Sequence, residues 1–374
     1  MIDAAPRMAL AAERELEALV GVSSPSGDLE GGEECVTLAT AFLPTEAGVE
    51  RVECSTPGHA PDLIGFLRGR GTSRVLLLGH LDTVVAHDAH RPLERHGDRF
   101  TGSGAVDMKG GVALSLGLMR ELATRPELYA EAAILLVNDE EWRTAPFAHT
   151  ERFAGFDACL CFEAGERTEA GEEAVIVKRK AAATLRVHAH GRSAHSGSAP
   201  EKGRSALLAL ATVAQLVAAR SDPSGPDRLT AVPTILRSGD AFNVVPPAGE
   251  LLCDLRADRL EAFAPVLEAI PAEQDEVHLE PHMLRAWPGM DSRAATAGVL
   301  ATASESLGRP IIAAQRGGAS DASHVAAGGI ELTIDGLGPR GGGAHTPHEW
   351  VSAESLRTRA EVALAVTAAL LGAP

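Results

Sequence analysis

Apolar residues are distributed along the chain in two distinct patterns. Short apolar runs stand at 74–79, 133–137 and 158–162, and the stretch 108–122, which lies between two of them, reads as a helix. Short continuous runs of this kind are typical of strands that are buried on both faces of a sheet. Strands that alternate with helices therefore predict an α/β domain with a largely parallel sheet, covered by helices on both faces.

The pattern changes near residue 180. Residues 184–190 and 250–256 alternate between apolar and polar positions, which is typical of a strand with one exposed face. Residues 205–219 place apolar side chains at helical spacing. One-sided strands that pack on a helix indicate a small α+β domain. We interpret Pro281 and Pro288 as marking the exit from this domain.

The α/β pattern returns towards the C-terminus. An Ala-rich helix is predicted at 294–306, a strand at 330–334, and a last helix that starts after the N-cap residue Ser352 and ends near Leu371. The predicted architecture is an α/β domain formed by residues 1–179 and 289–374, which is interrupted by an inserted α+β domain at 180–288.

Charge and cysteine content narrow the range of functions. Of 374 residues, 34 are basic and 51 acidic, giving a net charge of −17, which disfavours binding to nucleic acid or to anionic membranes. No apolar run approaches the ~20 residues that cross a bilayer. The N-terminal segment reads as an amphipathic helix rather than a signal peptide, and five cysteines without CxxC spacing suggest buried, reduced thiols. We expect a cytoplasmic protein.

Acidic and histidine side chains follow the predicted strands. Because ligands gather beyond the carboxyl ends of strands in open α/β sheets, these residues are candidates for a common site. His80 and Asp82 project to the same side, and a carboxylate often orients a ligating imidazole. The other candidates are Asp107, Glu140, Glu141, Glu163 and, late in the chain, His345. Any one of them alone would be read as a surface residue, as would His87, His90, His96 and His149, which we expect to be exposed.

Taken together, two histidines and three carboxylates form a ligand set for a pair of divalent ions, with one carboxylate bridging. Glu140 is then left to act on a metal-bound water, whose pKa falls to about 7. Nitrogen and oxygen donors without thiolate favour two Zn²⁺ per chain, with Co²⁺ or Mn²⁺ as substitutes.

Motifs along nearly the whole chain resemble one enzyme family. They are GHLDTV (79–84), GSGAVDMKGG (102–111), NDEE (138–141), FEAGE (162–166), GRSAHSG (191–197), PEKGRSA (200–206), FNVVP (242–246), CDLRAD (253–258), GGASDA (317–322) and GGGAHTPHE (341–349). Their order and content are similar to the di-zinc metallopeptidase and amidohydrolase family, which contains glutamate carboxypeptidase, acetylornithine deacetylase and succinyl-diaminopimelate desuccinylase. The motifs look most like the glutamate carboxypeptidase branch.

The resemblance implies a role for each residue of the metal site. His80 and Glu163 would hold one zinc ion, Glu141 and His345 would hold the other, and Asp107 would bridge the two. Asp82 would orient His80, and Glu140 would be the general base and then the acid that protonates the leaving nitrogen. The peptide bond between Asp107 and Met108 is expected to be cis.

The resemblance also implies residues that act on the substrate. His195, from the inserted domain, would stabilise the tetrahedral oxyanion and could reach across a dimer, because the family implies a homodimer. Asn243, Arg256 and Gly317 would bind substrate, with the Arg256 guanidinium gripping a carboxylate. Without the resemblance, His195 reads as a surface residue and Asn243 as a turn residue, and Arg256 could simply pair with Asp254.

The predicted function is hydrolysis of an amide bond, in a small peptide or an N-acyl amino acid, adjacent to a free carboxylate. An N-acyl amino acid deacylase and a metal-binding protein without turnover are the alternatives. The chain departs from the family at Trp142, where a Gly/Ser-rich turn often follows the glutamate pair. Trp142 could narrow the acyl pocket or pack beneath the loop.

Overall fold

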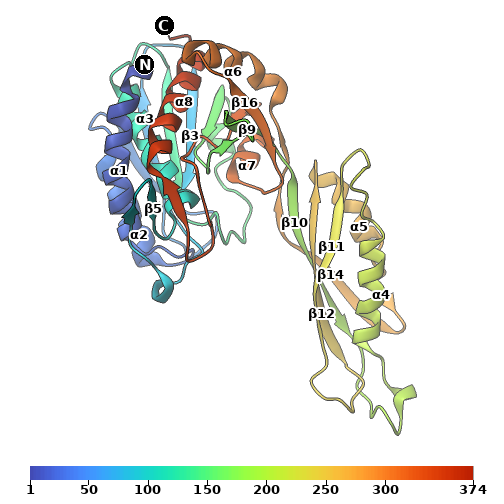
Figure 1. The fold of residues 1–374 in the computed structure, drawn as a ribbon. Coiled ribbons are helices and arrows are strands. Elements are labelled where there is room, and N and C mark those ends of the chain that lie inside the picture. The colour runs from blue at the N-terminus through green and yellow to red at the C-terminus, as the bar shows by residue number, and fades with distance from the viewer. Residues whose placement is uncertain (374) are drawn as a thin grey trace. The chain divides into compact units, whose positions relative to one another are not determined.

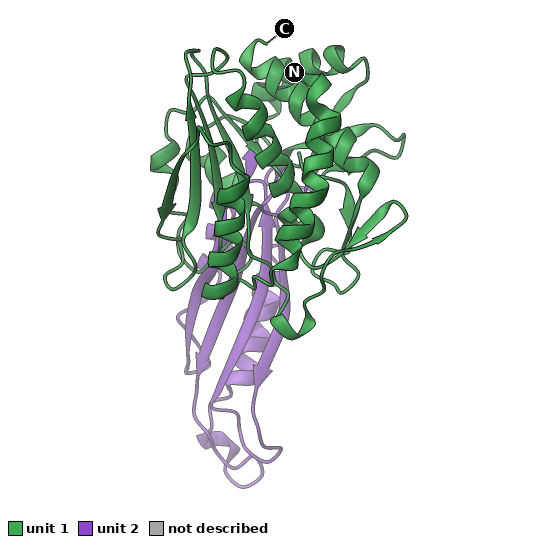
Figure 2. Cartoon of the chain, turned by 90° about the vertical axis from the view of Figure 1, so that its left-hand side faces the viewer, with its two compact units in different colours: residues 1–178, 291–315, 320–374 green, residues 179–290, 316–319 purple. Residues whose placement is uncertain are grey.

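A computed structural model describes residues 1–373 of the chain. The chain forms two compact units, which are coloured separately in Figure 2. Unit 1 contains Met1–Lys178, Asp291–Gln315 and the segment from Ser320 onward, and unit 2 contains Arg179–Met290 and Arg316–Ala319. Within residues 1–373, every helix is too short or too polar to cross a membrane.

Unit 1 is built on a six-stranded sheet with the order β1-β2-β6-β3-β7-β17. Its strands are β1 (Gly48–Val52), β2 (Asp62–Arg68), β6 (Glu131–Val137), β3 (Arg74–His80), β7 (Ala158–Cys161) and β17 (Leu332–Ile334). The pairs β6–β3, β3–β7 and β7–β17 are parallel, whereas β1 and β2 join in antiparallel fashion. The predicted α/β class with a largely parallel sheet is confirmed.

Helices supply the rest of the unit 1 core. They are α1 (Ala5–Gly21), α2 (Leu29–Phe42), α3 (Gly110–Ala123), α6 (Arg293–Leu307), α7 (Asp321–Ala327) and α8 (Ala353–Leu371). Helix α1 contacts α3 and α8, and the three lie together in Figure 1. Ala12, Leu16 and Leu19 share one face of α1 and are fully buried, as expected for an amphipathic helix. The Ser352 hydroxyl accepts a hydrogen bond from the Ser355 N–H at 3.2 Å, which fixes the start of α8.

Two small sheets contain further strands of the chain. One contains β4 (Glu94–His96), β5 (Arg99–Thr101), β18 (Gly341–Gly342) and β19 (Trp350–Ser352). The other contains β8 (Glu166–Arg167), β9 (Glu173–Arg179), β15 (Met290–Asp291) and β16 (Ile311–Arg316). The first of these sheets holds the segments on either side of the candidate ligand His345.

Unit 2 is an antiparallel sheet of five strands with the order β11-β12-β10-β14-β13. The strands are β10 (Ala181–His190), β11 (Thr230–Ser238), β12 (Ala248–Ala257), β13 (Glu273–Gln274) and β14 (Val277–Trp287), and the helices are α4 (Ala206–Ala218) and α5 (Ala264–Glu268). Leu185 and Val187 of β10 and Leu251 of β12 are buried with Leu210 of α4, while the intervening residues of both strands are more exposed. This arrangement is the one that the alternating pattern predicts.

Two expectations from the sequence are wrong. Pro281 does not mark an exit, because it lies within β14, where it pairs with Val187. On the outer side of β14, β13 pairs with residues 277 and 278, so the missing N–H of Pro281 removes no ladder hydrogen bond to β13. His149 is buried rather than exposed, and its Nε2 lies 2.7 Å from a carboxylate oxygen of Asp62.

Candidate metal centre

Strand β3 carries His80 to the carboxyl end of the main sheet of unit 1. The His80 side chain is almost completely buried, and its Nδ1 lies 3.0 Å from the backbone oxygen and 3.4 Å from a carboxylate oxygen of Asp82. The Asp82 carboxylate also accepts hydrogen bonds from the backbone N–H groups of Glu140 and Glu141, at 3.2 and 3.1 Å. Asp82 therefore connects His80 to the loop that carries both glutamates.

Asp107 lies between the two candidate histidine ligands. Its Oδ1 is 3.2 Å from His80 Nε2, and its Oδ2 is 3.1 Å from His345 Nε2. The backbone reaches this position through a kinked turn at 105–109, and the Asp107–Met108 peptide bond is cis, as expected. One carboxylate thus presents a different oxygen to each histidine, which is the arrangement of a bridging ligand.

The remaining carboxylates complete two groups of three donors. Glu163 Oε1 lies 3.8 Å from His80 Nε2, and Glu141 Oε2 lies 3.2 Å from His345 Nε2. Within each group, one donor atom from each residue lies within 4.8 Å of the others; the groups are His80, Asp107 and Glu163, and Asp107, Glu141 and His345. Three nitrogen and oxygen donors per group, with Asp107 in common, fit a pair of divalent cations.

The surplus of carboxylates controls the electrostatics of the site. Hydrogen bonds to Asp107 and Glu141 raise the pKa of His345 to about 10. Desolvation acts to lower the pKa of His80, but hydrogen bonds to Asp107 and Asp82 outweigh it and raise that pKa. Desolvation also opposes ionisation of Asp107, yet the two histidines hold its pKa below the usual value. The site therefore attracts positive charge, from protons or from cations.

Glu140 differs from its neighbour Glu141 in its surroundings. Desolvation raises the pKa of Glu140 well above its ordinary value, and the carboxylates of Asp321, Glu163 and Glu141 act in the same direction. It is absent from both groups of donors. A carboxyl group that is buried beside such a site and left out of the donor set is suited to exchanging a proton.

The chain is similar in sequence to proteins of one known family. Residues 76–369 match Peptidase family M20/M25/M40. The chain is 27% identical over 355 residues to carboxypeptidase G2 of Pseudomonas sp. (strain RS-16), covering 89% of this chain and 82% of that protein. It is 30% identical over 285 residues to succinyl-diaminopimelate desuccinylase of Corynebacterium glutamicum, covering 71% of this chain and 73% of that protein.

The chain belongs to peptidase family M20/M25/M40. It is accordingly a metal-dependent hydrolase, as predicted. Its fold is also similar to that of the Bacillus subtilis YXEP protein, which is described as a dinuclear metal-binding peptidase of the M20 family. The TM-score is 0.70 at 13% identity, and the match covers 99% of this chain and 100% of that chain. The two donor groups of this M20-family hydrolase fit a dinuclear centre of the same kind.

Unit 2 of this M20-family hydrolase brings two predicted residues together. His195 forms an isolated β-bridge with Val244, and the Ser196 N–H donates to the backbone oxygen of Asn243 at 3.0 Å. The His195 Nδ1 accepts hydrogen bonds from the N–H groups of Gly197 and Ser198, at 3.1 and 3.2 Å. When Nδ1 of a neutral imidazole is an acceptor, the ring proton is on Nε2, so His195 presents Nε2–H as a donor.

The other predicted substrate residues are less directly supported. Arg256 pairs with Asp254, which was the alternative to substrate binding: its guanidinium donates to both carboxylate oxygens of Asp254, at 3.0 and 3.1 Å. Gly317 is exposed, and a Cβ added there would meet no atom within 4 Å. Trp142 does not pack beneath its loop, because 58% of its surface is exposed.

Two buried ionic anchors were not recognised from the sequence. Arg143 donates to Asp139 on one side and to Asp321 on the other, and Asp139 also accepts from the Thr56 hydroxyl at 2.7 Å. This anchor holds the loop immediately after Glu140 and Glu141. An arginine beside a tryptophan in a loop gives no pattern by which its burial could be predicted.

The second anchor is Glu349, which holds the turn that carries Asp107. Its carboxylate accepts hydrogen bonds from the N–H groups of Gly104, Val106 and Asp107, at 2.9, 2.8 and 3.0 Å. Burial raises the pKa of Glu349 to about 7, although the three backbone donors oppose the rise. The sequence feature that could have indicated this role is its position at the end of the GGGAHTPHE motif, four residues after His345.

Replacing Glu349 with glutamine should weaken metal binding without changing side-chain size. The Glu349 carboxylate accepts hydrogen bonds with both of its oxygens, whereas glutamine has only one acceptor oxygen. The NH₂ group of glutamine would face a backbone N–H, so the turn that carries Asp107 would lose at least one hydrogen bond. We expect the affinity for Zn²⁺, measured by competition with a chromophoric chelator, to fall about 10–100-fold. Glu354→Gln, which alters an exposed glutamate on α8, is the matched control and should leave it unchanged. Wild-type affinity in E349Q would contradict this role.

Proposed function

We propose that the chain hydrolyses an amide bond adjacent to a free carboxylate and requires two divalent cations, with zinc as the favoured metal and cobalt or manganese as substitutes. His80 and Glu163 would hold one ion, Glu141 and His345 the other, and Asp107 both. The observation that carries the proposal is the Asp107 carboxylate, whose two oxygens face His80 and His345 separately. Such ions supply Lewis acidity, which polarises a carbonyl group and makes hydroxide available at neutral pH.

Proton transfer is assigned to Glu140. Its carboxylate would take the proton from the attacking water as general base and then deliver it to the leaving nitrogen as general acid. The raised pKa supports this cycle, because a carboxyl group that binds its proton more tightly is a better base before the bond breaks. Asp82 would orient His80 through the contact with its Nδ1.

Residues of unit 2 would act on the substrate. His195 would donate Nε2–H to the oxyanion that develops on the carbonyl oxygen, a role supported by the two backbone N–H groups that occupy its Nδ1. Asn243, Arg256 and Gly317 would bind substrate, with the Arg256 guanidinium turning from Asp254 to the free carboxylate. A carboxylate can replace Asp254 because both offer two oxygens to the same planar fork.

The extent of the similarities supports a proposal for the type of substrate. The match with carboxypeptidase G2 covers 89% of this chain, whereas the match with the C. glutamicum desuccinylase covers 71%. This difference favours a glutamate carboxypeptidase type of activity, on small peptides or N-acylated amino acids that end in a free carboxylate. An N-acyl amino acid deacylase of the acetylornithine or succinyl-diaminopimelate type is the alternative.

A substrate panel tests the activity and the site at once. Wild-type chain loaded with zinc should hydrolyse acyl- and peptidyl-glutamate faster than N-acetylornithine or N-succinyl-diaminopimelate, and should act poorly on the same glutamate compounds with the carboxylates amidated. Glu140→Gln should keep both metal ions and lower turnover about 10²–10⁴-fold. Near-normal turnover in E140Q would refute the assigned role. Preference for the succinyl substrate would support the deacylase, and two bound ions without any hydrolysis would refute the proposed activity.

We also propose a cytoplasmic location and a homodimer formed through unit 2. The five cysteines are free and buried, in keeping with a reducing compartment. In unit 2, Leu208 of α4 and Val232 of the edge strand β11 are 66% and 48% exposed, and Leu207, Ile235 and Leu236 are also exposed. An edge strand beside an exposed apolar helix face is suited to pairing with a second copy.

Sedimentation velocity tests this dimer. The wild-type protein should sediment as a species of twice the chain mass. Leu208→Glu should increase the fraction of monomer, because a charge would replace an apolar contact in the interface. Leu10→Glu is the matched control, since Leu10 is 60% exposed but lies on α1 of unit 1. A monomeric wild type, or a dimer that is unaffected by L208E, would contradict the assignment.

A further inference from the structure

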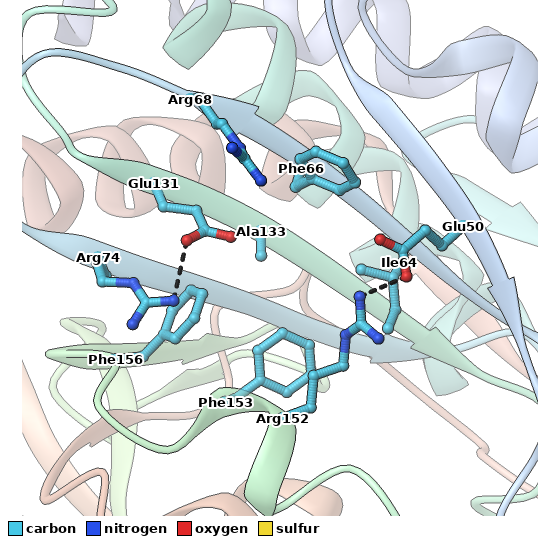
Figure 3. Close-up of a pocket in the computed structure, with 10 residues that line it drawn as sticks. All are labelled: Glu50, Ile64, Phe66, Arg68, Arg74, Glu131, Ala133, Arg152, Phe153 and Phe156. Carbon is cyan, nitrogen blue, oxygen red and sulfur yellow. Dashed lines mark hydrogen bonds and ion pairs between the residues drawn. The ribbon is translucent and has the colours of Figure 1, made fainter.

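A cavity of about 160 Å³ lies on the main sheet of unit 1, away from the candidate metal ligands. Figure 3 shows the side chains around it, which come from strands β1, β2, β3 and β6 and from the segment after β6. Its lining combines three arginines with three phenylalanines: Arg68, Arg74, Arg152, Phe66, Phe153 and Phe156. Such a lining offers both cationic and aromatic contacts.

Strand alternation explains how the sequence builds this cavity. Ile64, Phe66 and Arg68 are spaced two residues apart in β2 and project to one face. In the register, Glu131 of β6 is opposite Arg68 on one side and Arg74 of β3 on the other. A carboxylate is therefore flanked by two guanidinium groups in adjacent strands.

The charges around the cavity do not balance. Arg74 pairs with Glu131 at 2.9 Å, and Arg152 pairs with Glu50. Arg68 has no carboxylate partner among residues 1–373, and its guanidinium lies 5.8 Å from the centre of the Phe66 ring (Figure 3). The lining thus carries one surplus positive charge, on a chain whose net charge is −17. A bound anion would balance this surplus charge of the lining.

The apolar part of the lining adds a preference for a flat ring. Phe153 and Phe156 are buried and meet edge to face with their ring centres 5.3 Å apart, and the Arg74 guanidinium lies 4.3 Å from the centre of the Phe156 ring. Aromatic rings pack well against such faces and edges. A cavity of roughly 150 Å³ accommodates a benzene ring, so the volume suits one ring whose charged substituent faces solvent.

The position of the cavity separates it from the metal centre. Strand β3 begins at Arg74, which lines the cavity, and ends at His80, the candidate ligand. Six residue steps of an extended strand span about 20 Å. Substrates of open α/β sheets bind at the carboxyl ends of the strands, so a ligand at the amino end of β3 would occupy a second site.

We propose that this cavity binds a planar aromatic carboxylate of about the size of benzoate. The ring packs against the phenylalanines, and the carboxylate pairs with Arg68, the guanidinium without a partner. The site does not depend on the hydrolytic activity proposed for the metal centre.

Calorimetric titration of the full-length, zinc-loaded chain with benzoate tests the site. Arg68→Gln removes the charge, and Arg70→Gln is the matched control, since Arg70 is also exposed but does not line the cavity. We expect R68Q to bind benzoate about tenfold or more weakly than wild type, the loss expected for one charge-assisted hydrogen bond. R70Q should match wild type.

Two further probes separate the ring from the charge. Benzyl alcohol keeps the ring and acetate keeps the carboxylate, and each should bind about tenfold or more weakly than benzoate. Equal binding of benzoate to wild type and R68Q would overturn the proposal and would place the ligand elsewhere, for example at the metal centre. Binding of acetate or inorganic phosphate as tight as that of benzoate would overturn it in favour of a simple anion site.

Discussion

The metal centre depends on one carboxylate that contacts two histidines at once. Asp107 meets His80 with one oxygen and His345 with the other, although these histidines are 265 positions apart in the chain. Two triads of donors exist only because Asp107 belongs to both. If that carboxylate were turned or withdrawn, each histidine would be left with one glutamate, Glu163 for His80 and Glu141 for His345.

Buried polar anchors hold the loops that bring these donors together. Asp82 bonds to the backbone of Glu140 and Glu141, Glu349 bonds to the backbone around Asp107, and the Arg143 pair with Asp139 and Asp321 fixes the loop that follows the glutamates. Loops at the end of a sheet cannot be positioned by hydrophobic packing alone, because their backbone groups need hydrogen-bond partners. Carboxylates provide these partners and at the same time concentrate negative charge, which favours cations.

Much of the fold was predictable, because periodicity reports burial directly. The buried strands, the one-sided strands of unit 2 and the last helix, which Ser352 caps, all appear where the sequence pattern indicates them. The ligand candidates were predictable because they follow strands. Long-range pairing was not: nothing near Arg143 in the sequence indicates Asp321, and nothing near Gly104 indicates Glu349. The prediction that Pro281 marks a domain exit was wrong because a proline is tolerated where a strand has a free edge. That edge exists only in the assembled sheet.

The most direct test is anomalous scattering from crystals of the chain grown with zinc. We expect two zinc peaks on either side of the Asp107 carboxylate, about 3.5–4 Å apart as in other two-metal sites, one beside His80 and Glu163 and the other beside Glu141 and His345. A single peak, or two peaks of which neither contacts Asp107, would contradict this expectation.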